Sequence, residues 1–350
     1  MSTMRTQPPV SPLHQRGLSL VELVIGIFIG LMVVVALGYV YVGARQSYIM
    51  QDNMARVQES GRYALELMSR EIRMAGYMGC PSLSYLTPSV IANSPPSASF
   101  TLSNTLLGYE AGAGWTNSTT ITRVGDSDVI QINRAATQGV YLTGNMAAVN
   151  ANIQIGSNPY GYAANDVLFI TDCAHADIFR ATTVSSGSGG IITAAHSNSH
   201  NTSNNLSYTY GTDAMVMGYE SSLFFIGTNP AGNPALYRVP WSGGALGAAQ
   251  ELVENVEDMQ ITYGVDTTPS PDGDGQIDAY VAADAVASWN QVRSVRIRLL
   301  LRSSENGVTN QPQTYLWDTD NDGTLDTVTA GDRRLRYVFS TTVGIRNRLP

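Results

Sequence analysis

The stretch Arg16-Gly17-Leu18-Ser19-Leu20-Val21-Glu22 opens an apolar run that ends near Ala44, and this run is the strongest structural signal in the chain. No charged residue lies between Leu23 and Ala44. With a rise of ~1.5 Å per helical residue, the run spans about 30 Å, which matches the hydrocarbon core of a bilayer. The sequence therefore predicts a membrane-spanning helix over residues 23–44.

Glu22 lies at the threshold of this run, where a carboxylate is unfavourable unless a positive charge neutralises it. Cleavage between Gly17 and Leu18 would create a free amine four residues before Glu22. An ionisable residue at this depth marks a functional position by default. We therefore expect a chain-terminal amine to neutralise the Glu22 carboxylate.

Gly17 followed by an apolar residue, with Glu22 fifth in the mature chain, resembles the class III signal of type IV prepilins. In that family a prepilin peptidase cuts after the glycine on the cytoplasmic face and N-methylates the new terminus. The resemblance implies a leader peptide over residues 1–17, cleavage between Gly17 and Leu18 with methylation of Leu18, and an assembly role for Glu22. Leu18 stands where most members carry phenylalanine.

Two simpler interpretations of the N-terminus are a secretory signal peptide and a plain membrane anchor. Val42-Gly43-Ala44 imitates a signal-peptidase site, but the apolar run is about twice the usual 7–15-residue core. Arg5 and Arg16 fit a plain anchor with a cytoplasmic N-terminus. Neither interpretation accounts for Glu22, so the prepilin interpretation is favoured.

The composition is that of an exported protein with a β-rich head. Charged residues make up only 14% of the 350 residues, and every one of the 20 basic residues is arginine. Loss of the leader removes Arg5 and Arg16, so the side-chain balance of the mature chain becomes 18 − 28 = −10. An acidic chain without a basic patch argues against nucleic-acid binding.

The pattern beyond the membrane run is amphipathic and continuous with it. No proline interrupts Leu18 to Met78, and arginines and glutamates alternate with an apolar stripe at three- and four-residue steps. We expect one helix over residues 18–78, in the membrane over 23–44 and amphipathic over 45–78. The stripe consists of Met50, Met54, Val57, Gly61, Ala64, Leu65, Met68, Ile72 and Ala75.

Residues 79–350 contain short stretches typical of strands, separated by polar loops. The clearest is Val295–Arg302, where apolar residues hold the odd positions and arginines hold 296, 298 and 302. Residues 185–212 are rich in Ser, Gly and Asn and are expected to form a flexible surface loop, with His196 and His200 solvated. The predicted fold is α+β and pilin-like, with one long helix and a β-rich, loop-rich head containing antiparallel sheet.

Four segments of the head resemble the PilW family of minor type IV pilins: Ala75–Cys80, Leu252–Met259, Tyr263–Asp266 and Arg346–Leu349. The resemblance implies a low-copy subunit that primes pilus assembly near the tip with other minor pilins, the major pilin and a PilY-type tip protein. It also implies a single-pass inner-membrane protein with a periplasmic head before assembly, and a place in the pilus fibre afterwards. Alternatives are a GspJ-like minor pseudopilin of type II secretion and a calcium-dependent pilus adhesin.

The two cysteines, Cys80 and Cys173, lie in a chain expected to be exported to an oxidising compartment. An even number of cysteines and the position of Cys80 just beyond the helix favour a disulfide that ties helix to head. Cys173-Ala174-His175 also permits a metal site or a nucleophile. That signal is weak because no further spaced ligands accompany it.

Two aspartate-rich loops resemble the first half of an EF-hand-type calcium loop, with aspartates at alternate positions before a glycine. Thr329 stands where a glutamate would close the later site. The competing interpretation is an ordinary Asp/Gly turn in each loop. The later loop offers Asp318, Asp320, Asp322, Thr324 and Asp326, and the earlier and weaker one offers Asp272, Asp274 and Asp278, with Ser270 in the first aspartate position.

Motifs of catalysis are not evident in the sequence. It contains four histidines, one of them in the leader, and no GxSxG, P-loop, HExxH or spaced Cys/His cluster. We therefore expect no enzymatic activity and no cofactor besides calcium.

Overall fold

The computed structural model describes residues 19–80, 83, 85–93, 100–101, 103–242, 245–268, 274–320 and 323–348. The cleavage residues Gly17 and Leu18 lie outside this part of the chain, as do Asp272 and Asp322. The chain divides between Asp52 and Asn53 into two compact units, and each is described by itself.

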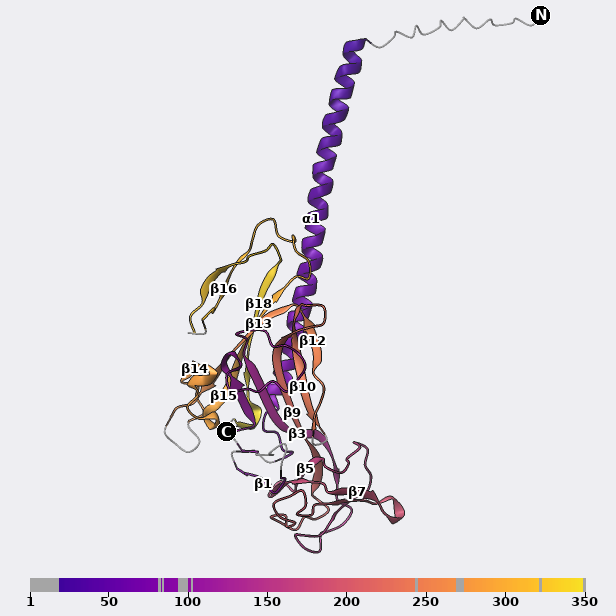
Figure 1. The fold of residues 1–350 in the computed structure, drawn as a ribbon, viewed down its shortest axis with the longest axis vertical. Coiled ribbons are helices and arrows are strands. Elements are labelled where there is room, and N and C mark those ends of the chain that lie inside the picture. The colour runs from indigo at the N-terminus through magenta and orange to yellow at the C-terminus, as the bar shows by residue number, and fades with distance from the viewer. Residues whose placement is uncertain are drawn as a thin grey trace, which may run out of the picture. The chain divides into compact units, whose positions relative to one another are not determined.

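The first unit is the apolar part of helix α1 (Leu20–Arg73), drawn in indigo in Figure 1. Its large apolar side chains from Leu20 to Val42 are all exposed. Among the described residues α1 is the one helix whose length and composition allow it to cross a membrane. A helix that is apolar on every side needs an apolar surrounding, which agrees with association with a membrane or a filament.

The second unit begins with the amphipathic part of α1, whose inner face is buried at Val57, Ala64, Met68 and Ile72. The helix ends at Arg73, five residues before the predicted end at 78. The amide of Gly76 donates to the carbonyl of Asn133 at 2.9 Å, and Gly76 has a φ of 72°. The helix ends early for two reasons. The Gly76 amide bonds to a neighbouring strand, and Gly76 adopts the left-handed backbone conformation that glycine favours.

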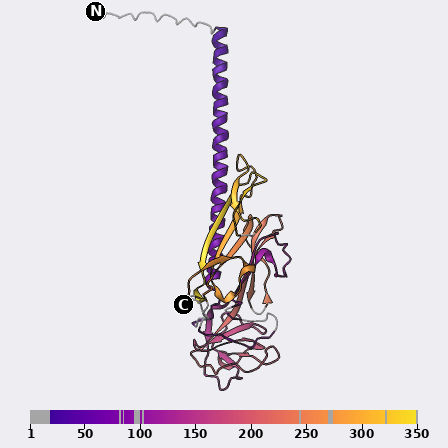
Figure 2. The same cartoon turned by 90° about the vertical axis from the view of Figure 1, so that its left-hand side faces the viewer.

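A four-stranded antiparallel sheet of order β14-β13-β15-β18 packs on α1, and β18 runs beside the helix in Figures 1 and 2. Its inner face joins the helix in one core, which includes Met259, Ile297 and Leu299. The predicted strand Val295–Arg302 is the main part of β15, and its alternation matches this burial. The bounds are β13 Val256–Val265, β14 Ala279–Val281, β15 Val292–Arg302 and β18 Arg336–Gly344.

A nine-stranded sheet forms the other layer, in the order β1-β6-β5-β9-β10-β11, with β12 on β10 and the β2–β3 pair on β9. All its described pairs are antiparallel except β1 with β6. The predicted α+β fold, a long apolar helix with antiparallel sheets, is confirmed. The strands are β1 Ser89–Val90, β2 Leu106–Tyr109, β3 Val129–Tyr141, β5 Val167–Thr171, β6 Ala176–Arg180, β9 Met215–Thr228, β10 Pro234–Ser242, β11 Ala245–Leu246 and β12 Gln250–Glu254.

Two small sheets complete the second unit: β4-β8-β7 and the hairpin β16-β17. The flexible loop expected over 185–212 is wrong in part, because β8 lies inside it and Tyr210 is fully buried. His196 is buried as well, and its Nε2 lies 2.9 Å from the carbonyl oxygen of Ala151. The strands are β4 Ile153–Ile155, β7 Thr183–Ser186, β8 Ile192–Ala195, β16 Thr314–Trp317 and β17 Asp326–Thr329, and the short 3-10 helices are η1 Glu110–Gly112, η2 Ser188–Gly190, η3 Ala283–Ala285, η4 Trp289–Gln291 and η5 Arg346–Arg348.

Glu71 fastens the end of α1 to the nine-stranded sheet. Its two carboxylate oxygens lie 3.3 Å from Arg134 on β3 and 3.3 Å from Arg238 on β10. All three side chains are largely shielded from solvent. The network links the end of the helix to both strands. Removing one of the three side chains would leave a desolvated charge without its partner, which is strongly destabilising.

Candidate functional site

Glu22 closes the N-terminus of α1 in a capping box. The Ser19 amide donates to Glu22 Oε2 at 3.0 Å, and the Val21 amide donates to Ser19 Oγ at 3.2 Å. The pattern Ser19-x-x-Glu22 is a known signature of helix starts, and it was readable in the sequence. Glu22 therefore has a local structural role in addition to the predicted assembly role.

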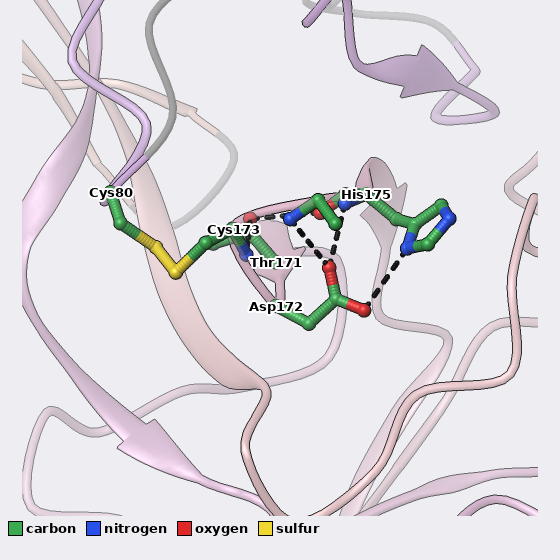
Figure 3. Close-up of a disulfide and its surroundings, with 6 residues drawn as sticks. Cys80, Thr171, Asp172, Cys173 and His175 are labelled. Atoms are coloured by element: carbon green, nitrogen blue, oxygen red, sulfur yellow. Dashed lines mark hydrogen bonds and ion pairs between the residues drawn. A yellow bond between two sulfur atoms is a disulfide. The ribbon is translucent and has the colours of Figure 1, made fainter.

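The predicted disulfide between Cys80 and Cys173 is confirmed, with Cα atoms 5.2 Å apart (Figure 3). It joins the segment that follows α1 to the turn between β5 and β6. Cys173 has a φ of 75°, which is uncommon for a residue with a side chain. Because the sulfur of Cys173 is bonded to Cys80, it is not available as a nucleophile or metal ligand beside His175.

The turn around Cys173 is organised by its neighbours (Figure 3). Asp172 Oδ1 accepts the amides of Ala174 at 2.9 Å and His175 at 2.6 Å, while Asp172 Oδ2 lies 3.1 Å from His175 Nδ1. Burial would raise the pKa of Asp172, but the hydrogen bonds from His175 and Ala174 outweigh it and lower the pKa. The His175 ring stacks on Tyr208 at 3.6 Å between centroids. These contacts give His175 a structural role.

The later aspartate loop joins β16 to β17 and gathers carboxylates. Oxygens of Asp318, Asp320 and Asp326 all lie within 4.8 Å of one another. Asp318 Oδ2 accepts the Gly323 amide at 2.8 Å, and Asp326 Oδ2 accepts the Thr319 amide at 3.1 Å. Hydrogen bonds from the Thr319 hydroxyl and amide lower the pKa of Asp326. An all-oxygen cluster of this kind can hold a hard metal ion.

The earlier loop repeats this hydrogen-bond pattern with a different first aspartate. Asp266 Oδ2 accepts the Gly275 amide at 2.9 Å, and Asp278 Oδ2 accepts the Thr267 amide at 2.7 Å. The predicted alignment put Ser270 in the first position, but Asp266 is the structural counterpart of Asp318. Asp266 is fully buried and already lies 3.4 Å from the Arg293 guanidinium.

The earlier loop therefore differs from the later one, because the Arg293 guanidinium already offsets the negative charge of its first aspartate, Asp266. Asp274 Oδ1 accepts the amide of Gln276 at 2.9 Å, as in an ordinary turn. Within the described residues, no group of three acidic, histidine or cysteine ligands forms at this loop. The described part of the chain thus offers one candidate metal cluster, and it lies in the later loop.

A cavity of about 380 Å³ lies beside the later loop, and Asp318 and Gly323 form part of its wall. Asp128 lies in the same wall and is only 2% exposed. Its two carboxyl oxygens accept the amides of Ala111 at 2.8 Å and Ile261 at 2.7 Å. No local sequence pattern indicates this site, because its residues come from separate loops and strands.

Burial raises the pKa of Asp128 to about 8, and repulsion from Glu110 adds to the rise. Burial likewise raises the pKa of Glu110, although the Ala283 amide donates to its Oε2 at 3.0 Å. Perturbed carboxyls in a cavity are typical of binding sites, but they also occur in structural networks.

The outer face of the four-stranded sheet supplies the opposite charges of this cavity. Arg296 and Arg298 line it, and the Arg296 guanidinium lies 3.8 Å from the centre of the Tyr280 ring. The described lining contains no histidine, cysteine or serine. These groups can hold a charged or polar partner.

Comparison with known proteins identifies part of the chain. Residues 223–347 match the family model described as type IV pilus-assembly protein W. No curated protein and no solved structure matches significantly. The match covers the four-stranded sheet and both aspartate loops, whereas α1 and the two cysteines lie outside it. Residues 223–347 are thus similar to the PilW family of type IV pilus-assembly proteins.

Proposed function

We propose that this chain is a minor type IV pilin, which helps to start pilus assembly and sits at low copy near the pilus tip. The observation that supports the proposal best is the combination, in one chain, of an exposed apolar helix with a PilW-family region. A major pilin also has such a helix, so the minor role depends on the family. The expected partners are other minor pilins, the major pilin and a PilY-type tip protein.

The proposed pathway begins in the inner membrane, with the head in the periplasm. Prepilin peptidase removes residues 1–17 by cutting between Gly17 and Leu18, and methylates the Leu18 amine. In the filament, Glu22 then meets the amine of a neighbouring subunit, which neutralises a carboxylate at the edge of an apolar segment. Mass spectrometry of the membrane-bound protein tests the processing step. A mature terminus at Arg45 would contradict it.

We further propose that the later aspartate loop binds calcium. The cluster of Asp318, Asp320 and Asp326 supports this, because calcium prefers oxygen ligands and tolerates irregular geometry. Asp322 and Thr324 are the expected additional ligands from the same loop. This observation also favours a second candidate function, a calcium-dependent adhesin carried on the pilus.

Two substitutions at one position test the assembly role of Glu22. Glu22→Ala removes both the charge and the capping-box acceptor, whereas Glu22→Gln removes the charge and can keep the cap, because Gln also serves at this position. We expect both variants to be cleaved normally and both to be depleted from sheared pili. If Glu22→Gln enters pili at the wild-type level, the residue acts only as a helix cap.

Deletion of the gene tests the function as a whole. We expect surface pili and pilus-driven motility to fall sharply while the cellular pool of major pilin stays normal, because a primer controls the number of filaments. Blots of sheared and whole-cell fractions measure both quantities. Normal pilus number with lost adhesion would favour the adhesin. Failure to secrete a folded exoprotein would favour the pseudopilin.

A further inference from the structure

A cleft of about 480 Å³ lies on the nine-stranded sheet, away from the aspartate loops, where strand β3 bulges from β9. Ala135 pairs with Tyr219 and Gly139 pairs with Met217, so three residues of β3 face the single residue Gly218. Gly218 has no side chain to occupy the cleft, and a Cβ there would make ordinary van der Waals contacts with Tyr162 at 3.8 Å and Ala136 at 4.0 Å. Bulges of this kind often lie next to binding sites, and the volume is in the range of small-molecule sites.

Tyrosines contribute to the apolar part of this cleft, together with smaller apolar residues. Tyr160 is 45% exposed, and its ring centroid lies 6.0 Å from that of the mostly buried Tyr162. Asn158 fixes the loop that carries both rings, because its amide group donates to the Tyr162 carbonyl at 2.8 Å and accepts the Tyr162 amide at 2.7 Å. The exposed ring therefore stands on a fixed backbone, as a stacking platform requires.

The carboxylates of the cleft are already balanced by arginines. Glu220 forms an ion pair of 2.6 Å with Arg134. Burial raises the pKa of Asp166, and the Arg180 guanidinium opposes that rise. No basic side chain lines the cleft among the described residues. The cleft thus combines acceptor oxygens with little net charge, which suits a neutral ligand better than a cation.

The polar edge of the cleft adds donors and acceptors. Thr137 and Gln138 lie on the bulge of β3, line the cleft and are exposed to solvent. A hydroxyl and a side-chain amide can each donate and accept hydrogen bonds. A suitable ligand presents an apolar face to a tyrosine ring and many neutral hydroxyls at its rim, which is the chemistry of a pyranose sugar.

We infer that the cleft between Tyr160 and the β3 bulge binds a neutral saccharide, with a pyranose ring stacked on Tyr160 and its hydroxyls bonded to Asp166, Glu220 and Gln138. This binding activity goes beyond the assembly role and does not depend on it. It gives the head a carbohydrate receptor site whose lining lies outside residues 223–347 and outside the candidate calcium loop.

Saturation-transfer NMR on the full chain in a polyoxyethylene ether detergent, which contains no sugar, tests the inference. The probes are lactose, maltose and cellobiose, with N-acetylarginine amide as a cationic probe. We expect at least one disaccharide to show saturated ring protons. Tyr160→Ala should raise its Kd by at least about tenfold through loss of the stacking surface. Gln138→Ala, at an exposed position that does not hold the fold, should weaken binding to a smaller degree.

Tyr141→Ala is the matched control, because Tyr141 is a 60% exposed tyrosine at the end of β3 that does not line the cleft. It should leave the Kd unchanged. The inference is overturned if no disaccharide binds, if Tyr160→Ala and Tyr141→Ala bind equally well, or if the arginine amide displaces the sugar.

Discussion

Loss of the Cys80–Cys173 disulfide should destabilise the head by several kcal/mol. The bond closes a loop with a sequence separation of 93 residues. In the chain-entropy model, such a loop restricts the unfolded state by about 4.6 kcal/mol at 25 °C. The left-handed backbone at Cys173 opposes this by about 1–2 kcal/mol, since the turn can relax once the bond is absent. We therefore expect a net loss of about 3 kcal/mol for Cys80→Ala with Cys173→Ala.

Urea unfolding of the full chain in detergent, followed by tryptophan fluorescence, measures this loss. Trp317 is buried in the head and reports its unfolding. With an m-value of about 3 kcal/mol per molar urea, the midpoint should fall by about 1 M while m changes little. Reductant should lower the wild-type midpoint by a similar amount and leave the double variant unchanged.

Two further variants separate the bond from the backbone. Cys80→Ala alone should lose as much stability as the double variant, because either change opens the loop. Cys80→Ala with Cys173→Gly should be no more stable than the double alanine variant, because the turn that holds Cys173 at a φ of 75° has already relaxed in both variants. A double alanine variant whose midpoint stays within about 0.2 M of wild type would contradict the prediction, since it would show that the loop constraint contributes little to stability.

Three other predictions concern packing, pH and the ion. Gly61→Ala places a Cβ 2.5 Å from the Phe339 ring, so we expect stability to fall by about 1–2 kcal/mol, visible as a lower Tm. Phe339→Leu in the same background should recover part of this loss. An unchanged Tm in Gly61→Ala would contradict the close contact between the helix and Phe339. Asp128 has its pKa raised to about 8 in the fold, so the unfolded state releases the proton first and stability should fall from pH 4 to 8 by up to about 1.4 kcal/mol per unit. Asp128→Asn should make the urea midpoint depend less on pH between pH 5 and 8. If the midpoints of wild type and variant fall with the same slope, the prediction is wrong. Calcium at about 10 mM, above the ~10⁻³ M of weak extracellular sites, should raise the Tm of the full chain; Asp320→Ala with Asp326→Ala should abolish the rise, and a wild-type Tm that ignores calcium would leave the loop an ordinary turn.

Local signals in the sequence were sufficient for the helix and for one strand. The uncharged apolar run, the amphipathic pattern that follows it and the absence of proline specify α1 as far as its last turn. The alternation along Val295–Arg302 specifies which face of β15 is buried. The disulfide followed from the cysteine count, because two cysteines allow one intramolecular pairing. The end of the helix was misplaced because the Gly76–Asn133 bond is a tertiary contact without a sequence pattern.

The carboxyl groups that line the cavity beside the later aspartate loop had no such signal in the sequence. Asp128 and Glu110 are separated in sequence from Arg296 and Asp318, and only the packing of loops onto the sheet brings them together. Asp266 was missed for a related reason. It lies nine residues before its partner Gly275, whereas Asp318 lies five residues before Gly323, so a fixed spacing finds the shorter loop and misaligns the longer one.

On the proposed assembly role, Glu22 has two partners in turn, the Ser19 amide and an amine of a neighbouring subunit. In the described structure its carboxylate already accepts the Ser19 amide, so the side chain is not an unsatisfied charge waiting for an amine. On the proposed assembly role, contact with a neighbouring subunit exchanges a local hydrogen bond for an ion pair between chains. The net gain is the difference between the two, which is smaller than the gain for a bare carboxylate in an apolar medium. Wherever the amine of a neighbour lies out of register, the carboxylate returns to its cap and the subunit gains nothing. The capping box therefore makes Glu22 a better determinant of register than of affinity.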